Sequence, residues 1–135
     1  MRVVIDTNVI VSGLLNPFGK PAQILGLILD ERIALCYDSR IIMEYSEVLH
    51  REKFGFPKKD VMTILDFIES TGLFVSAQPS SVLLHDKTDL PFLEVCISAS
   101  AEYLITGNLN HFPKKIGKAH VPDPALFLDK HLGNQ

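Results

Sequence analysis

Three carboxylates in separate parts of the chain are of the type that could hold a divalent cation together. Asp6 ends an apolar run at the start of the chain, Glu44 lies on the apolar face of a predicted helix, and Asp89 precedes another helix. Like charges that converge cannot all stay ionised without a counter-charge, so convergence of these residues would imply a bound cation. Ligation by oxygen atoms alone favours Mg²⁺ or Mn²⁺ over Zn²⁺.

The chemistry that such a site serves best is hydrolysis of a phosphodiester bond. A divalent cation can bind a non-bridging oxygen, activate a water for in-line attack and stabilise the leaving oxygen, and no side-chain nucleophile is needed. Hydroxyl and amide side chains next to the acids would then orient carboxylates or waters. The residues of this kind are Thr7, Asn8, Thr106 and Asn108.

Other enzymes that place an aspartate at a strand end fit the sequence less well. Phosphotransferases of the haloacid-dehalogenase type need Asp-x-Asp-x-Thr, but the run from Asp6 to Ile10 lacks the second acid. A response-regulator receiver needs an acidic pair on its first strand, and none accompanies Asp38. No glycine-rich phosphate loop is present. The five histidines lack metal-ligand spacing, and among them only His111 neighbours the candidate site residues.

The elements that must position these residues follow from hydrophobic periodicity. Apolar runs predict strands, and amphipathic stretches predict helices between them. The predicted strands are 1–5, 33–37, 73–75, 102–106 and 119–121, and the predicted helices are 9–15, 22–31, 39–52, 58–71, 90–101 and 124–131. This alternation predicts an α/β fold with a central, mostly parallel sheet of four to five strands flanked by helices. Ligands of such sheets bind beyond the carboxyl ends of the strands, which is where Asp6 would stand.

Two of the acids also have a purely structural interpretation at this point. Glu44 shares a helix face with Ile41, Tyr45, Val48 and Leu49, where a carboxylate is costly unless it is paired or holds a cation. A glutamate at the edge of the core whose head reaches solvent would fit the same pattern. Asp89 would either cap the following helix or be aimed into the site by the helix end.

Composition indicates one globular domain over 1–135, with 47% hydrophobic and 21% charged residues. The longest apolar stretches, 9–15 and 24–29, are far below the roughly 20 residues that span a bilayer. No secretory signal precedes the first strand, so we expect a cytoplasmic protein. Cys36 and Cys96 lie in apolar segments without metal-like spacing, and we expect buried free thiols.

The net charge of −3 does not point to nucleic-acid binding. Basic residues nevertheless gather in three short clusters, which are either solvated faces or contacts for phosphates. The clusters are Arg51 with Lys53, Lys58 with Lys59, and Lys114 with Lys115 and Lys118.

Four ordered motifs resemble the PIN-domain family, and the resemblance covers essentially the whole chain. They are Asp6-Thr7-Asn8-Val9, Glu44-Tyr45-x-Glu47-Val48-Leu49, Asp86-x-x-Asp89-x-x-Phe92-Leu93-Glu94, and Tyr103-Leu104-Ile105-Thr106-Gly107-Asn108. The chain is most similar to the ribonuclease toxins of type II toxin–antitoxin systems. The resemblance implies a three-layer PIN-like fold, a Mg²⁺- or Mn²⁺-dependent ribonuclease that acts on RNA, and a protein antitoxin that covers the acidic crevice.

The resemblance also assigns roles to individual residues. Asp6, Glu44 and Asp89 match the first, second and third acids of the family and would be both catalytic residues and metal ligands. Asp86 matches a nearby acid that is less central, and Asp86 and Asn108 are further candidate metal ligands. Thr106 matches the serine or threonine after the last strand.

The chain departs from the family pattern at Asn108, where a fourth acid is common. An amide keeps one oxygen ligand but removes a negative charge, which weakens a second metal site. The position after Asp89 is Leu90, where many relatives have another acid. The main hypothesis is a metal-dependent endoribonuclease, and the alternative is a non-catalytic PIN module that binds RNA or a protein. A homodimer is common among similar proteins, and the apolar residues of 24–29 and 61–68 are either core or a dimer face.

Overall fold

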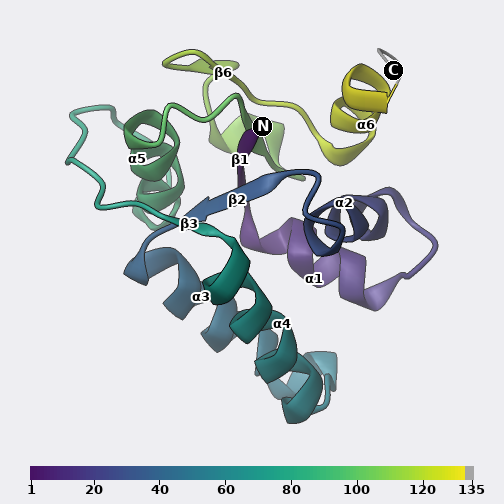
Figure 1. Ribbon diagram of the computed structural model, residues 1–135. Coiled ribbons are helices and arrows are strands. Elements are labelled where there is room, and N and C mark those ends of the chain that lie inside the picture. Colours follow the sequence, from purple (N-terminus) through teal and green to yellow (C-terminus); the bar gives the residue numbers. More distant parts are fainter. Residues whose placement is uncertain (133–135) are drawn as a thin grey trace.

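The centre of the molecule is a six-stranded sheet whose middle strands are apolar and buried (Figure 1). The computed structural model describes residues 1–132, so the last three residues of the domain expected over 1–135 lie outside the described part. The strands lie in the order β3-β2-β1-β4-β6-β5. Their bounds are β1 (Arg2–Ile5), β2 (Ala34–Tyr37), β3 (Leu73–Phe74), β4 (Tyr103–Ile105), β5 (Lys115–Ile116) and β6 (Ala119–His120). All neighbouring strands are parallel except β5 and β6, as the α/β prediction required.

Helices flank this sheet and connect its strands. They are α1 (Thr7–Leu15), α2 (Lys20–Leu29), α3 (Ser39–Leu49), α4 (Lys58–Thr71), α5 (Leu90–Ser98) and α6 (Pro124–Leu132), with short 3₁₀ helices η1 (Glu52–Phe54), η2 (Lys87–Asp89) and η3 (Leu109–His111). Helix α5 packs against β1, β2 and β4, while α3 and α4 pack against β2 and each other. Helix α1 packs against α2, which in turn contacts α6 (Figure 1).

Two predicted helices are shorter in the structure because local signals end them. The helix expected over 39–52 ends at Leu49, and 52–54 form a separate 3₁₀ turn. The helix expected over 90–101 ends at Ser98. Ser100 adopts a left-handed φ of 51°, and Ala101 donates its N–H to the carbonyl of Cys96 at 3.0 Å. This pairing is the Schellman motif, which closes helices without requiring a glycine.

The prediction of four to five strands missed β5. This strand is two residues long and pairs antiparallel with β6 across the turn Gly117-Lys118. Gly117 has a positive φ of 56°, which tight hairpin turns require and which glycine adopts without strain. Two residues carry no measurable periodicity, so the pairing could be seen only in three dimensions.

The two cysteines agree with the prediction made from the sequence. Cys36 and Cys96 are free and buried, and burial raises the pKa of the two thiols to about 11 and about 12, respectively. No helix within residues 1–132 is long and apolar enough to cross a membrane.

Candidate functional site

Asp6 stands where β1 and β4 end side by side. The two strands are parallel and pair Ile5 with Ile105, so the residues that follow them are neighbours. The N–H of Asp6 donates to the carbonyl of Ile105 at 2.9 Å, and the hydroxyl of Thr106 donates to Asp6 Oδ2 at 2.8 Å. Both Asp6 and Thr106 are buried. The Asp6 carboxylate is therefore held at the carboxyl edge of the sheet by a residue 100 positions away.

Glu44 reaches the same edge from α3. The adjacent Tyr45 is fully buried, and its hydroxyl donates to the carbonyl of Ile5 at 2.5 Å, which anchors α3 to the end of β1. Glu44 is only partly buried, and its Oε2 accepts a hydrogen bond from the hydroxyl of Thr7. Because Thr7 directly follows Asp6, the two carboxylates lie on either side of one threonine.

Asp89 occupies the N-cap position of α5, but its side chain makes no capping hydrogen bond. Its Oδ2 instead lies 3.1 Å from Nδ1 of His111 in η3. Asp6 is likewise the N-cap residue of α1 without a side-chain capping bond, whereas Asp38 caps α3 by accepting the N–H of Ile41 at 3.0 Å. The capping interpretation of Asp89 is thus wrong. Both aspartates still benefit from the partial positive charge at their helix ends.

Burial raises the pKa of all three carboxyl groups. For Asp6 this effect is opposed by the hydrogen bond from Thr106 and reinforced by the charge of Asp89. For Glu44 the hydrogen bond from Thr7 opposes burial, and the charge of Asp6 adds to it. For Asp89 the charge of His111 opposes burial, while Glu44 contributes in the same direction as burial. Each carboxylate therefore lies within electrostatic reach of another.

No lysine or arginine in the described part of the chain forms an ion pair with Asp6, Glu44 or Asp89. The cationic groups that act on this negative charge are His111 beside Asp89, when it is protonated, and Arg51, which acts on Glu44 over a longer distance. Within residues 1–132, no three His, Cys, Asp or Glu side chains are grouped closely enough to hold a metal ion. The three carboxylates thus lie within electrostatic reach of one another at this edge of the sheet, but their oxygens do not converge into a coordination cage.

The remaining predicted residues border the three acids. Asn8 accepts the N–H of Gly107 through Oδ1 at 3.3 Å, which joins the start of α1 to the loop after β4. Asn108 is exposed, and its backbone N–H donates to Thr106 Oγ1 at 3.0 Å. Asp86 is exposed, and its Oδ1 accepts the N–H and the hydroxyl of Thr88, which lowers the pKa of Asp86. Asp86 thus opens η2 and remains ionised beside the site.

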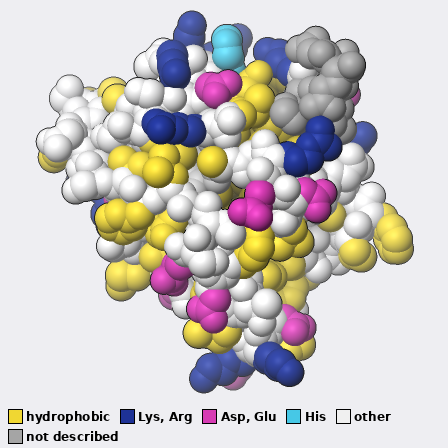
Figure 2. All heavy atoms as spheres, in the orientation of Figure 1, with side chains coloured by type: hydrophobic (Ala, Val, Ile, Leu, Met, Phe, Trp, Pro, Cys, Tyr) yellow, Lys and Arg dark blue, Asp and Glu magenta, His cyan; other side chains and the backbone are white. Residues whose placement is uncertain are grey.

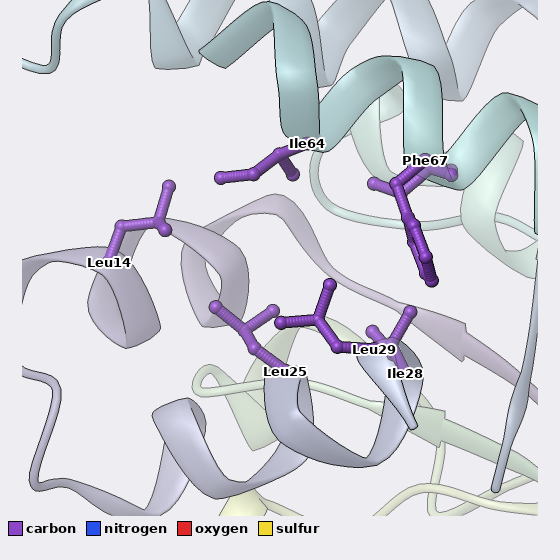
Figure 3. A pocket seen from close by; sticks show the side chains of 7 residues that line it. Leu14, Leu25, Ile28, Leu29, Ile64 and Phe67 are labelled. Carbon is purple, nitrogen blue, oxygen red and sulfur yellow. The ribbon is translucent and has the colours of Figure 1, made fainter. Parts of the chain in front are cut away.

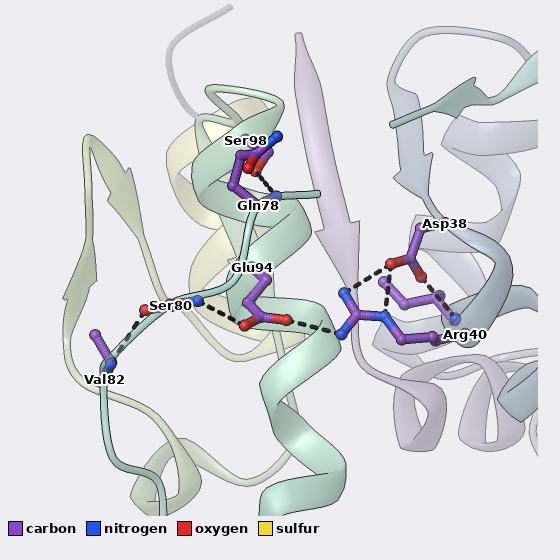
Figure 4. A network of polar contacts seen from close by, with 8 residues as sticks. Asp38, Arg40, Gln78, Ser80, Val82, Glu94 and Ser98 are labelled. Carbon is purple, nitrogen blue, oxygen red and sulfur yellow. Dashed lines mark hydrogen bonds and ion pairs between the residues drawn. The ribbon is translucent and has the colours of Figure 1, made fainter. Parts of the chain in front are cut away.

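A partly buried ion-pair network next to the site was not predicted from the sequence (Figure 4). Arg40 contacts Glu94 Oε1 and Asp38 Oδ2, both at 2.7 Å, and Glu94 Oε2 accepts the N–H of Ser80 at 2.7 Å. The signal that could have found it is Glu94 itself, an acid in the otherwise apolar α5, because a buried carboxylate needs a partner. The contact between Asp89 and His111 was not predicted either, although the sequence places His111 close to Thr106 and Asn108.

Comparison with known proteins agrees with this architecture. An uncharacterised protein of Methanocaldococcus jannaschii is 29% identical over 142 aligned positions, which cover 96% of this chain and 91% of that protein. A chain in the crystal structure of VapBC2 from Rickettsia felis bound to a DNA fragment from their promoter superposes with a TM-score of 0.57 at 17% identity, covering 91% of this chain and 98% of that chain. This likeness is one of fold. The sequence model of the PIN domain matches residues 2–110, and the chain therefore belongs to the PIN domain family.

Proposed function

We propose that this protein is a metal-dependent endoribonuclease in which Asp6, Glu44 and Asp89 are the catalytic carboxylates. The observation that carries the proposal is the gathering of these three acids beyond the ends of β1 and β4, without a lysine or arginine partner among the described residues. Membership of the PIN domain family supports it, because the ribonuclease toxins that the sequence resembles carry acids at the same three motif positions.

The donor set suits Mg²⁺ or Mn²⁺ because it consists of hard carboxylate oxygens that form no ion pair with a lysine or arginine among the described residues. Asp6, Glu44 and Asp89 would hold the ion, which would supply a Lewis acid for a phosphate oxygen and for a water. The agreement is in charge and in the type of ligand atom, and Glu44 and Asp89 also form hydrogen bonds with Thr7 and His111.

The surrounding residues would orient the acids. Thr106 donates to one oxygen of Asp6, and Thr7 donates to one oxygen of Glu44. Nδ1 of His111 lies 3.1 Å from Oδ2 of Asp89, so this contact would hold the third carboxylate in place.

We also propose that the protein acts in the cytoplasm as the toxin of a toxin–antitoxin pair. The fold is similar to a chain of the VapBC2 complex from Rickettsia felis, which supports a protein partner of the antitoxin kind. A gene for a short DNA-binding protein next to the gene for this chain would strengthen the proposal.

A second candidate function is that of a non-catalytic PIN module that binds RNA or a protein. Asn108 favours it, because this exposed amide stands where similar nucleases commonly have a fourth acid. Asp86 does not replace that acid, since its carboxylate is engaged by Thr88.

The test is cleavage of structured and single-stranded RNAs by purified protein in Mg²⁺, Mn²⁺ or chelator. We expect metal-dependent cleavage that falls at least about 100-fold in Asp6→Asn, the scale of losing a positioned catalytic group. The matched control is Asp66→Asn, which removes an exposed acid of α4 and should leave the rate unchanged. A folded protein that cuts no RNA with either metal, or an Asp6→Asn variant that cuts as well as the parent, would establish the binding module instead.

A further inference from the structure

Residues 103–122, from the start of β4 to the residue before Asp123, carry a local positive charge that the whole chain lacks. Residues 103–122 include three lysines and two histidines and no Asp or Glu, although the net charge of the protein is −3. Figure 2 shows Lys and Arg side chains and a histidine gathered at the end of the molecule where Figure 1 places β6. Lys114, Lys115, Lys118 and His120 are all exposed. The third basic cluster of the sequence is thus concentrated on the β5–β6 hairpin.

The backbone under these lysines is held in place. Strand β6 pairs with β4 through Tyr103 and His120, and Val121 donates its N–H to the carbonyl of Lys114 at 3.3 Å. Lys115 lies directly opposite His120 in the antiparallel ladder, where a second basic group is no electrostatic partner. Within residues 1–132, no carboxylate forms an ion pair with Lys114, Lys115 or Lys118. Their charge is available to an external anion.

A cleft of about 480 Å³ lies beside the hairpin, and we call it the β5–β6 cleft. Its walls include Leu109, Asn110, Lys114, His120 and Pro122. Leu109 and Asn110 belong to η3, the turn whose last residue, His111, contacts Asp89. The cleft is therefore lined by residues that directly precede His111 in the sequence, and it combines apolar, amide and basic groups.

We propose that the β5–β6 cleft binds the backbone and a base of single-stranded RNA next to the bond that is cut. This inference rests on the proposed function. The acidic site repels phosphates, so the affinity for a polyanion must come from neighbouring positive charge. The hollow accepts individual nucleotides with phosphates near Lys114 and Lys115, whereas a duplex would not enter it. Single strands, unlike duplexes, can turn their bases into such a hollow.

The test is binding of a short, fluorescently labelled single-stranded RNA of mixed sequence, followed by anisotropy across a range of salt concentrations. All proteins carry Asp6→Asn so that the RNA is not cut. The variant is Lys114→Gln with Lys115→Gln. The matched control is Lys58→Gln with Lys59→Gln, which removes the same charge at the start of α4, at the opposite end of the molecule from β6 (Figure 1).

We expect the hairpin variant to weaken binding by about 10-fold or more at low salt and to reduce the slope of log K against log salt by about 1.4, or 0.7 per phosphate contact. The control should bind as the parent does, and thermal unfolding should show all the proteins to be folded. The inference would be overturned if both variants lost the same affinity for RNA, if neither variant lost affinity, or if the Asp6→Asn protein without further substitutions bound no RNA. The last two results would point to a protein ligand for the cleft.

The outcome is separable from that of the proposed function. If the wild-type protein cuts RNA and the substitutions Lys114→Gln and Lys115→Gln leave its KM unchanged, the inference is wrong and the nuclease proposal stands. Lysine-dependent RNA binding by a protein that cuts nothing would support the inference and overturn the nuclease.

Discussion

Asp6, Asp38 and Asp89 each precede an α-helix at its N-cap position, and their hydrogen-bond partners give them different roles. Asp38 accepts a backbone N–H of its own helix, as a capping aspartate should. Asp6 and Asp89 forgo that bond and turn to Thr106 and His111, which lie beyond the end of β4. Because burial and mutual repulsion raise the pKa of both, these carboxylates cost folding free energy when they are ionised.

Replacing Asp6 by asparagine should therefore stabilise the protein when no metal is bound. Thr106 can still donate to the amide oxygen, while the desolvated charge and its repulsion with Asp89 are removed. We expect the free energy of unfolding at neutral pH in chelator to rise by about 1 kcal/mol, within the usual range of single substitutions. Thermal denaturation of Asp6→Asn and the control Asp66→Asn measures the difference. A lower melting temperature for Asp6→Asn alone would contradict the electrostatic account.

The same effect predicts how stability depends on pH. The folded-state pKa values of Asp6, Glu44 and Asp89 lie above the ordinary values of 3.8, 4.5 and 3.8, so the folded state holds these protons more tightly than the unfolded state does. The stability that this tighter proton binding provides is complete at pH values below the ordinary pKa values. It is lost as the pH rises through the folded-state pKa values. The difference in free energy of unfolding between Asp6→Asn and the wild-type protein should therefore increase as the pH rises through these pKa values. At neutral pH, Mg²⁺ or Mn²⁺ should reduce this difference by binding and stabilising the wild-type protein.

At the scale of elements, the polar network of Arg40 with Asp38, Glu94 and Ser80 connects three parts of the chain that are not joined by strand pairing. Arg40 belongs to α3, Glu94 to α5, and Ser80 to the segment that leads from β3 to η2 (Figure 4). Glu94 is buried, whereas about half of the Arg40 side chain is exposed. The network thus fixes α5, and with it Asp89, relative to the helix that carries Glu44.

Removing the buried partner should be costly. We expect Glu94→Ala to lower the free energy of unfolding by about 1–3 kcal/mol, less than the roughly 3–5 kcal/mol of a fully buried pair, because solvent screens Arg40. The control Glu47→Ala breaks an exposed pair with Arg51 and should leave the free energy of unfolding almost unchanged, because solvent and salt screen that pair. Urea denaturation measures both changes. Equal effects of the two substitutions would show that the Glu94 network adds no stability.

At the scale of the whole molecule, an open apolar hollow of about 60 Å³ lies between α1, α2 and α4 (Figure 3). It is lined by Leu14, Leu25, Ile28, Leu29, Ile64, Phe67 and Ile68. Ile28 and Ile68 are buried and belong to the core, whereas Leu29 is 57% exposed. Part of this surface therefore belongs to the core, and only its exposed residues are available to a dimer face.

The homodimer stays a prediction, and Ile64 is the residue that tests it. Ile64 is partly exposed in the hollow, so an aspartate there should be tolerated by the monomer but not by an apolar interface. Light scattering should show a dimer for the parent and a folded monomer for Ile64→Asp. Circular dichroism serves as the control for folding. A monomeric parent, or a variant that unfolds, would show that this surface joins no second copy.

The sequence by itself determined what depends on neighbouring residues. Hydrophobic periodicity placed most of the parallel strands and helices to within a few residues, and the polar residues at the ends of β1 and β4 marked the edge of the sheet where Asp6 stands. Helix ends and β5 were less predictable, since the Schellman motif at Ser100 and the turn at Gly117 depend on single backbone conformations. Periodicity averages over several residues and does not detect them.

Only the tertiary structure decided which side chains meet across long distances in the sequence. Thr106 reaches Asp6, Thr7 reaches Glu44, and Arg40 reaches Glu94 over separations of 100, 37 and 54 residues. Motif order alone predicted the three acids but not their partners. The physical reason is that a hydrogen bond or ion pair depends on distances of a few ångström, which are set by how the strands and helices pack and not by the residues next to each group.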